Sequence, residues 1–127
     1  MIVKQLSDII GSQHDIDTPN WRSYRLLLKK DNLGFSLHHT IIKKGTETYI
    51  WYKNHLEAVY CIKGVGEIEF IATGEIFPIK EGTLYALDKH DEHYLRATTD
   101  MHMVCVFNPP LVGDEIHDEN GVYPLKD

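Results

Sequence analysis

The amino-acid sequence predicts an all-β protein, a sandwich or barrel of short antiparallel strands, with one short helix at its N-terminus. Residues 45–108 show no helical periodicity, and recurring glycines divide this region into short runs. In the run EIEFIATG, apolar and acidic residues alternate, so Ile68 and Phe70 share one face and Glu67 and Glu69 the other. Short strands separated by turn residues at such intervals are typical of β-sandwiches and β-barrels.

Length and composition limit the possible functions. A chain of 127 residues allows one domain with one core, and we expect a single domain over 1–127. The net charge is −6 and no basic run offsets it, which argues against a nucleic-acid partner. No apolar stretch approaches the roughly 20 residues that cross a bilayer, and the N-terminus lacks a signal-peptide pattern. Cys61 and Cys105 are interpreted as reduced thiols. We therefore expect a cytoplasmic protein without a membrane partner.

The N-terminal elements follow from apolar spacing. Helical spacing of apolar residues predicts a short helix over about 3–10. After a polar loop, the sequence WRSYRLLLKK predicts a strand over 21–30. On this strand Trp21, Ser23 and Arg25 share a face, so Arg25 has an aromatic neighbour instead of bulk solvent.

The turn signal DNLG precedes a second strand, FSLHHTIIK. Its alternation places Ser36, His38, Thr40 and Ile42 on one face. For such a polar set, exposure to solvent is the default interpretation, and the lining of a wet internal cavity is the alternative. The adjacent His38 and His39 point to opposite faces of the strand, so they are not a pair of metal ligands.

The stretch GTETYIWYKNHLEAVYCIKG, residues 45–64, has the spacing of the first cupin motif. Glu57 and the two bounding glycines keep their register. Trp51 and Lys53 stand at the two places where that motif usually carries metal-binding histidines. A metal site built on this stretch must therefore take its other ligands from elsewhere.

A second stretch, residues 82–97, has the spacing of the second cupin motif. Gly82 and His93 match, whereas the usual proline, second glycine and terminal asparagine are replaced. The two motifs occur in order, separated by an interval that a short β-hairpin fills. Together they resemble the cupin superfamily and predict a jelly-roll barrel with a short N-terminal helix.

Strand faces suggest a metal site inside this barrel. In a cupin the faces that carry Glu57 and His93 point inward, and Tyr85 lies on the strand that leads into His93. A carboxylate, a phenolate and an imidazole suit Fe(II) best, with Zn or another divalent metal possible. Tyr85 as a core aromatic is the plainer alternative, and His55 and His90 offer other imidazoles.

Several stretches then point to one cupin family. IWYKNHLEAVYCIKG, LDKHDEHYLRA, MVCVFNPPL and HDENGVYPL resemble ectoine synthase, essentially from Trp21 to the C-terminus. The resemblance implies an iron on Glu57, Tyr85 and His93. It also implies a cyclocondensation, in which the α-amine of N-γ-acetyl-L-2,4-diaminobutyrate attacks its own acetamide carbonyl and water leaves.

This chemistry assigns roles to further residues. Pre-orientation of the substrate needs a closed cavity, for which the family implies a lining of Trp21, Thr40 and Phe107. Arg25 is the candidate cation for the substrate carboxylate. A C-terminal flap over about 109–127 is expected to cover the cavity and exclude water. The candidates for proton transfer are Tyr52, His55, Glu115 and His117, and the expected substrate contacts are Trp21, Arg25, Thr40, Tyr52, Cys105, Phe107, Glu115 and His117.

Two other functions remain open at this point: a non-catalytic cupin that binds a small molecule, and a different cupin enzyme that acts on a related amino-acid amide. The absence of an attached output segment disfavours a sensor, and the loss of the two motif-one histidines disfavours a dioxygenase. Exposed edge strands of a small jelly roll, together with the family resemblance, lead us to expect a homodimer.

Overall fold

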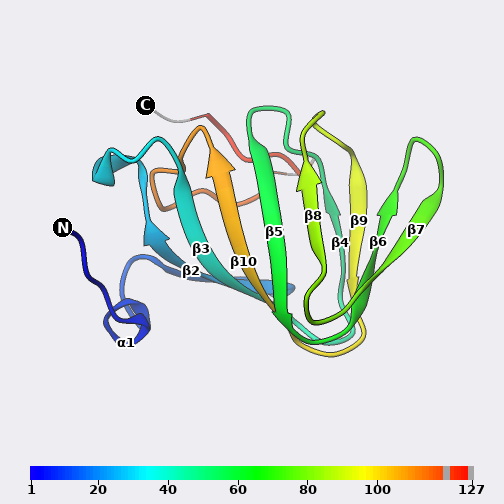
Figure 1. Cartoon of the computed structure of the whole chain (residues 1–127), viewed down its shortest axis with the longest axis horizontal. Coiled ribbons are helices and arrows are strands. Elements are labelled where there is room, and N and C mark those ends of the chain that lie inside the picture. The colour runs from blue at the N-terminus through cyan, green and yellow to red at the C-terminus, as the bar shows by residue number, and fades with distance from the viewer. Residues whose placement is uncertain (119–120, 126–127) are drawn as a thin grey trace.

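The computed structural model describes residues 1–118 and 121–125 and consists of two antiparallel sheets (Figure 1). A six-stranded sheet has the order β1-β2-β3-β10-β5-β8, and a four-stranded sheet has the order β4-β9-β6-β7. The strands are β1 (Asp15–Asp17), β2 (Trp21–Leu27), β3 (Ser36–Ile42), β4 (Glu47–Ile50), β5 (Leu56–Lys63), β6 (Gly66–Phe70), β7 (Glu75–Ile79), β8 (Leu84–Leu87), β9 (His93–Ala97) and β10 (Met101–Asn108).

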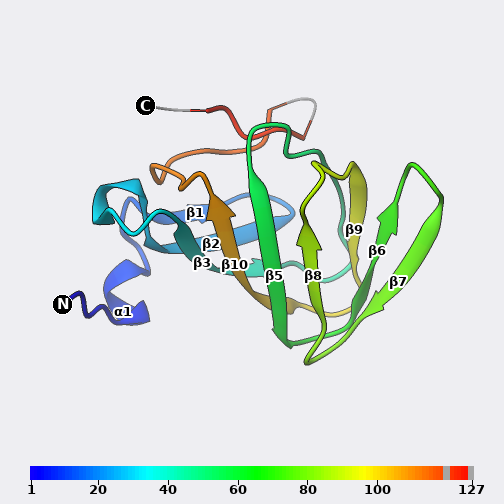
Figure 2. The ribbon, with the colours of Figure 1, turned by 45° about the horizontal axis from the view of Figure 1, so that its top comes forward.

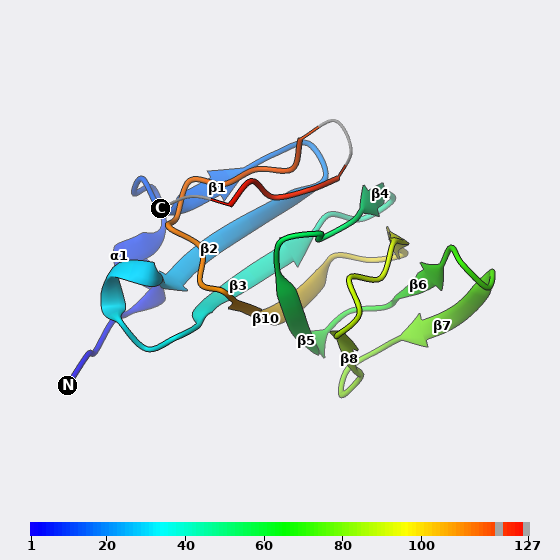
Figure 3. The ribbon, with the colours of Figure 1, turned by 90° about the horizontal axis from the view of Figure 1, so that it is seen from above.

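The core lies between the two sheets, because every second residue of the central strands is buried. In β3 and β10 the alternation is regular, and the inward residues of β5 and β9 complete the same core. Viewed from above, the β6–β7 hairpin projects from one side of the molecule (Figure 3). This arrangement is the predicted all-β jelly-roll barrel.

Two N-terminal elements are shorter than the sequence suggests. The helix α1 spans Leu6–Ile9, within the predicted range of 3–10. The predicted strand 21–30 ends at Leu27, and a 3-10 turn, η1 (Lys29–Asp31), follows it. The side chain of Asp31 accepts a 2.8 Å hydrogen bond from the backbone N–H of Leu28, which caps this turn and ends the strand.

The default interpretation of β3, with its polar face in solvent, is wrong. His38 is 1% exposed and Thr40 is 9% exposed, while the neighbouring His39 lies on the other face. The polar residues therefore face the space between the sheets. The alternative, the lining of an internal cavity, is the one that the structure adopts.

The chain after β10 runs across one end of the barrel (Figure 2). Two hydrogen bonds fasten it to the β4–β5 loop: Trp51 N–H donates to Gly121 O at 2.8 Å, and Asn54 Nδ2 donates to Tyr123 O at 2.9 Å. Of the predicted flap over 109–127, residues 119–120 and 126–127 lie outside the described part. The rest of the segment sits where a cover for the barrel is expected.

Gly64, the closing glycine of the first motif, is required by close packing. Its φ is +106°, and a Cβ at this position lies 2.2 Å from the carbonyl oxygen of Asp100. Any side chain here collides with backbone as well as adopting an unfavourable conformation. Among the described residues, no helix has the length and apolar character needed to span a membrane.

Candidate active site

The inner face of the six-stranded sheet carries rows of side chains that run across the strands. One row, from β8 to β2, consists of Tyr85, Val59, Cys105, His38 and Arg25, which are successive cross-strand partners. Directly opposite residues of antiparallel strands share a face, so these side chains line up on one side of the sheet. The two flanking rows are Leu87–Glu57–Phe107–Ser36 and Cys61–Met103–Thr40–Ser23.

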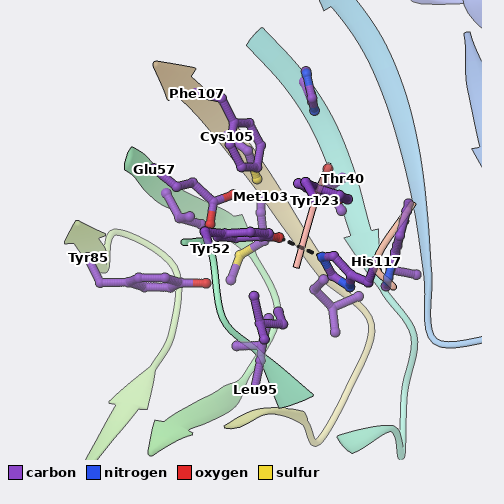
Figure 4. Close-up of a pocket in the computed structure, with 15 residues that line it drawn as sticks. Thr40, Tyr52, Glu57, Tyr85, Leu95, Met103, Cys105, Phe107, His117 and Tyr123 are labelled. Carbon is purple, nitrogen blue, oxygen red and sulfur yellow. Dashed lines mark hydrogen bonds between the residues drawn. The ribbon is translucent and has the colours of Figure 1, made fainter. Parts of the chain in front are cut away.

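A cavity lies over these rows. Its polar lining consists of His38, Thr40, Tyr52, Glu57, Tyr85, Cys105, His117 and Tyr123, and its apolar wall includes Trp21, Leu95, Met103 and Phe107. Figure 4 shows Glu57 and Tyr85 on one side, His117 on the other, and the ring of Tyr52 between them. The side chains leave a free volume of about 30 Å³, room for a water molecule or two.

Glu57 and Tyr85 form the end of the cavity that lies toward β8. Glu57 is buried, and burial raises the pKa of its carboxyl from 4.5 to about 8, with a hydrogen bond from Cys105 opposing this. Burial also raises the pKa of the Tyr85 phenol well above its usual value. A buried carboxylate without a cationic partner is unfavourable, so this pair is suited to a bound cation.

His93 approaches the same region from the facing sheet. Its Nδ1–H donates to the carbonyl oxygen of Asp91 at 2.9 Å, which leaves Nε2 unprotonated. Nε2 is buried and has no hydrogen-bond partner within the described residues. An imidazole held in this way by a backbone carbonyl has the arrangement typical of a metal ligand.

Tyr85 connects Glu57 with His93, because Tyr85 lines both the cavity and a wider cleft of about 480 Å³. His93 lies on the wall of this cleft. The donor set of carboxylate, phenol and unprotonated imidazole fits a divalent metal. Within residues 1–118 and 121–125, no three His, Cys, Asp or Glu side chains come close enough together to hold a metal ion. The predicted set has two side chains of these types, and its third donor is a phenol.

Arg25, at the β2 end of the long row, is completely buried. None of its three guanidinium nitrogens makes a hydrogen bond to a described residue. Its acidic neighbour is Glu115, with Nη1 and Oε1 3.8 Å apart, and the rings of Trp21 and Tyr123 lie 5.9 and 5.7 Å from its Cζ. A buried guanidinium with unused donors is well suited to bind a carboxylate.

Tyr52 and His117 form a pair in the cavity wall. The Tyr52 hydroxyl and His117 Nε2 are 2.8 Å apart, and the two rings lie 5.4 Å from each other. Burial raises the pKa of Tyr52 well above its usual value. Burial, followed by the charge of Arg25, lowers the pKa of His117 to about 3. Both groups are therefore uncharged at neutral pH and able to pass a proton along their hydrogen bond.

Two predicted proton-transfer residues, His55 and Glu115, do not line the cavity. His55 is buried with its ring 6.0 Å from that of Phe107 and 6.2 Å from that of Tyr123. The Glu115 carboxylate accepts 2.8 Å hydrogen bonds from the backbone N–H groups of Val112 and Gly113. Glu115 thus holds the start of the C-terminal segment, and both Glu115 and Arg25 lie outside the lining of the cavity.

Two polar lining residues, His38 and Tyr123, were not among the predicted site residues, and neither were the apolar lining residues Ile42, Ile50, Val59, Leu95 and Met103. His38 was assigned to a polar face without a role, and alternation alone cannot say which face of a strand is inside. Tyr123 stacks on Tyr52 at 4.9 Å and contacts the rings of Phe107 and His117. It belongs to an irregular segment, where no period predicts the direction of a side chain. The only signal for Tyr123 was its place in a stretch that resembles the family.

Known proteins resemble this chain over its whole length. The family model described as ectoine synthase matches residues 1–127. An L-ectoine synthase of Halalkalibacterium halodurans is 64% identical over 127 residues, covering 100% of this chain and 98% of the relative. An L-ectoine synthase of Desulfatibacillum aliphaticivorans is 64% identical over 129 residues, covering 100% and 99%.

Solved structures show the same likeness. The crystal structure of ectoine synthase from P. lautus superposes with a TM-score of 0.90 at 61% identity, covering 100% of this chain and 94% of that one. An RmlC-like cupin protein from Desulfovibrio desulfuricans shares the fold alone, with a TM-score of 0.52 at 22% identity over 61% of this chain and 74% of that one. On the full-length match of sequence and structure, this chain belongs to the ectoine synthase family of cupin-fold lyases, which make ectoine.

Proposed function

We propose that the chain cyclises N-γ-acetyl-L-2,4-diaminobutyrate to ectoine with the help of a divalent metal, in the cytoplasm of the cell that uses this compatible solute. The observation that carries this proposal is the row across the six-stranded sheet. A buried guanidinium that makes no hydrogen bond to a described residue, Arg25, stands at one end, and the Tyr85 phenol stands at the other, beside Glu57. One molecule with a carboxylate at one end and an amide carbonyl at the other suits both ends.

The residues that would hold the metal are Glu57, Tyr85 and His93. Their hard, mixed oxygen and nitrogen donors favour Fe(II), with Zn or another divalent metal as the alternative. When bound, such a metal supplies Lewis-acid polarisation of the acetamide carbonyl, which is otherwise a poor electrophile. The unprotonated, unpartnered Nε2 of His93 is the feature of this chain that supports the assignment.

The remaining residues bind the substrate and keep water away from it. Arg25 pairs with the substrate carboxylate, and the cavity folds the flexible chain so that its amine meets its own carbonyl. Pre-orientation of this kind contributes up to about 7–11 kcal/mol in favourable cases. Trp21, Phe107 and Tyr123 surround the reacting atoms with apolar surface, which disfavours hydrolysis of the intermediate.

We assign the transfer of protons to the departing oxygen to the Tyr52–His117 pair. Its 2.8 Å hydrogen bond lies within the cavity, whereas the other two predicted groups, His55 and Glu115, lie outside its lining. A neutral phenol donates to an oxygen that becomes more basic as the amine attacks, and the neighbouring imidazole resupplies the proton. His55 and Glu115 are positioning residues in this proposal.

The proposal is tested by incubating the purified protein with N-γ-acetyl-L-2,4-diaminobutyrate, with and without a chelator, and measuring ectoine by NMR. We expect ring closure that stops on metal removal and returns with Fe(II). Glu57→Ala, Tyr85→Ala and His93→Ala are each expected to lose bound metal and activity together. Ring closure that survives complete metal removal contradicts the metal dependence, and full metal occupancy in Tyr85→Ala contradicts the ligand set.

A homodimer is part of the same proposal. Strand β8 is an edge of the six-stranded sheet, and the wide cleft beside it is apolar. Leu84 on this strand is 65% exposed, and Phe77 across the cleft is 49% exposed. Apolar surface next to an open edge is a favourable place for a second copy. Light scattering after gel filtration is expected to give a mass twice the 14.7 kDa of one chain, and Leu84→Glu is expected to shift this mass toward that of the monomer.

A further inference from the structure

We propose that His38 is the base of the cyclisation: its Nε2 takes a proton from the substrate's α-ammonium group and so frees the lone pair that attacks the acetamide carbonyl. This inference rests on the substrate proposed above. It assigns a catalytic role to a residue whose position in the cavity was not expected from the sequence.

The first support is the position of His38 in the sheet. His38 on β3 is the direct cross-strand partner of Arg25 on β2, and Cys105 is its partner on the other side. The substrate's carboxylate and α-amine are attached to the same carbon atom. A carboxylate bound by Arg25 therefore brings the α-amine next to the neighbouring position of the row, which is His38.

The second support is an unused nitrogen. His38 lines the cavity and is 1% exposed, and its Nε2 has no hydrogen-bond partner in the part of the chain that the structure describes. Its ring is held against Phe107, with centroids 5.2 Å apart and planes at 35°. A buried polar atom without a partner is unfavourable unless a ligand supplies the missing hydrogen bond. The substrate's α-amine is a donor of the right kind.

The third support is the charge state of His38. The ionisable groups that face it are Arg25 from β2, Cys105 from β10 and, from the loop before β5, His55. Burial first, then the positive charge of Arg25 and the nearby His55, lowers the pKa of His38 well below its usual value. The imidazole is thus neutral before the reaction, which is the state that a base requires.

The proton balance is complete with groups on this chain. The α-nitrogen begins with three protons and ends with one, and the amide oxygen leaves with two as water. His38 takes the first proton; the amine then forms the C–N bond, and the carbonyl π electrons move to oxygen. The imidazolium returns this proton to the oxygen as the C–O bond breaks, because nitrogen and oxygen are then attached to the same carbon. The second proton passes from nitrogen to oxygen through the Tyr52–His117 pair.

The test compares His38→Asn and His38→Gln with a matched control, His39→Asn. His39 is the next residue, points to the opposite face and pairs with His102 at 3.0 Å. Because general bases contribute about 10²–10⁴-fold, we expect kcat of both His38 variants to fall at least 100-fold. Binding of ectoine, followed by tryptophan fluorescence, is expected to stay within about threefold of wild type, since amide side chains keep a hydrogen-bond acceptor. His39→Asn is expected to keep wild-type kcat.

Added imidazole separates a base from a merely structural residue. In His38→Ala, 50–100 mM imidazole (about the concentration range in which a missing side chain can be replaced by a solute) is expected to restore kcat at least tenfold, with more rescue as the pH rises through about 6.5–7. A kcat within threefold of wild type in His38→Asn and His38→Gln, or no rescue of His38→Ala, overturns the role as base. Thermal melting identifies any of the three His38 variants that fails to fold. The two remaining variants then decide whether His38 is the base. If wild type itself forms no ectoine, the proposed function fails, irrespective of His38.

Discussion

Replacing Glu115 with alanine tests whether this carboxylate stabilises the buried charge of Arg25 in the folded protein. Glu115 is 1% exposed and Arg25 is fully buried, with 3.8 Å between Oε1 and Nη1. The substitution also removes both acceptors of the N–H groups of Val112 and Gly113. Breaking a buried ion pair costs about 3–5 kcal/mol, because one charge stays buried without a partner. We expect a loss of this size in the free energy of unfolding.

Urea denaturation followed by circular dichroism measures this loss, and the midpoint of thermal unfolding is expected to fall by roughly 10–20 °C for a chain of this size. Glu47→Ala is the matched control. Glu47 lies 2.7 Å from Arg96, but its side chain is 57% exposed. An exposed pair contributes about 0–1 kcal/mol. If Glu115→Ala destabilises the protein no more than Glu47→Ala does, the dependence of Arg25 on Glu115 is refuted.

Three further substitutions probe the candidate site. Arg25→Ala is expected to raise KM about 10–100-fold through loss of charge-assisted hydrogen bonds to the substrate carboxylate, measured by steady-state kinetics; an unchanged KM removes Arg25 from the site. Tyr123→Ala enlarges a free volume of about 30 Å³, so the ratio of kcat/KM for an N-propionyl substrate to that for the N-acetyl substrate is expected to rise; an unchanged ratio means that Tyr123 does not limit the space. Burial and the charge of Arg25 lower the pKa of His117 from 6.5 to about 3, so the unfolded chain binds this proton first as the pH falls. The free energy of unfolding is therefore expected to decline from pH 6.5 toward 3, and urea titrations of His117→Gln are expected to show a shallower decline.

Periodicity predicted the sheets well because burial on one face imposes a period of two. Ile68 on β6 and the inward positions of β5 and β9 follow directly from this rule. The same rule did not determine which face of β3 lies inside the protein. Alternation groups His38 with Thr40, yet only the packing of a second sheet decides whether that group faces solvent or a cavity.

The C-terminal segment shows where sequence reasoning ends. Glu115 and His117 are two residues apart, and an extended chain places them on the same face. In the structure His117 lines the cavity, whereas Glu115 turns toward the N–H groups of Val112 and Gly113. The described residues of this segment have no sheet partner to keep them extended, so hydrogen bonds to individual backbone groups decide the direction of each side chain. Such contacts leave no repeating pattern in the sequence.

The row from Tyr85 to Arg25 also keeps two groups of opposite charge apart. Its two ends are four strands apart, and each interval is fixed at about 4.8 Å by backbone hydrogen bonds. The buried guanidinium of Arg25 and the buried carboxyl of Glu57, beside Tyr85, therefore form no ion pair with each other in the described part of the chain. Each group is left to bind a ligand of opposite charge instead of neutralising the other.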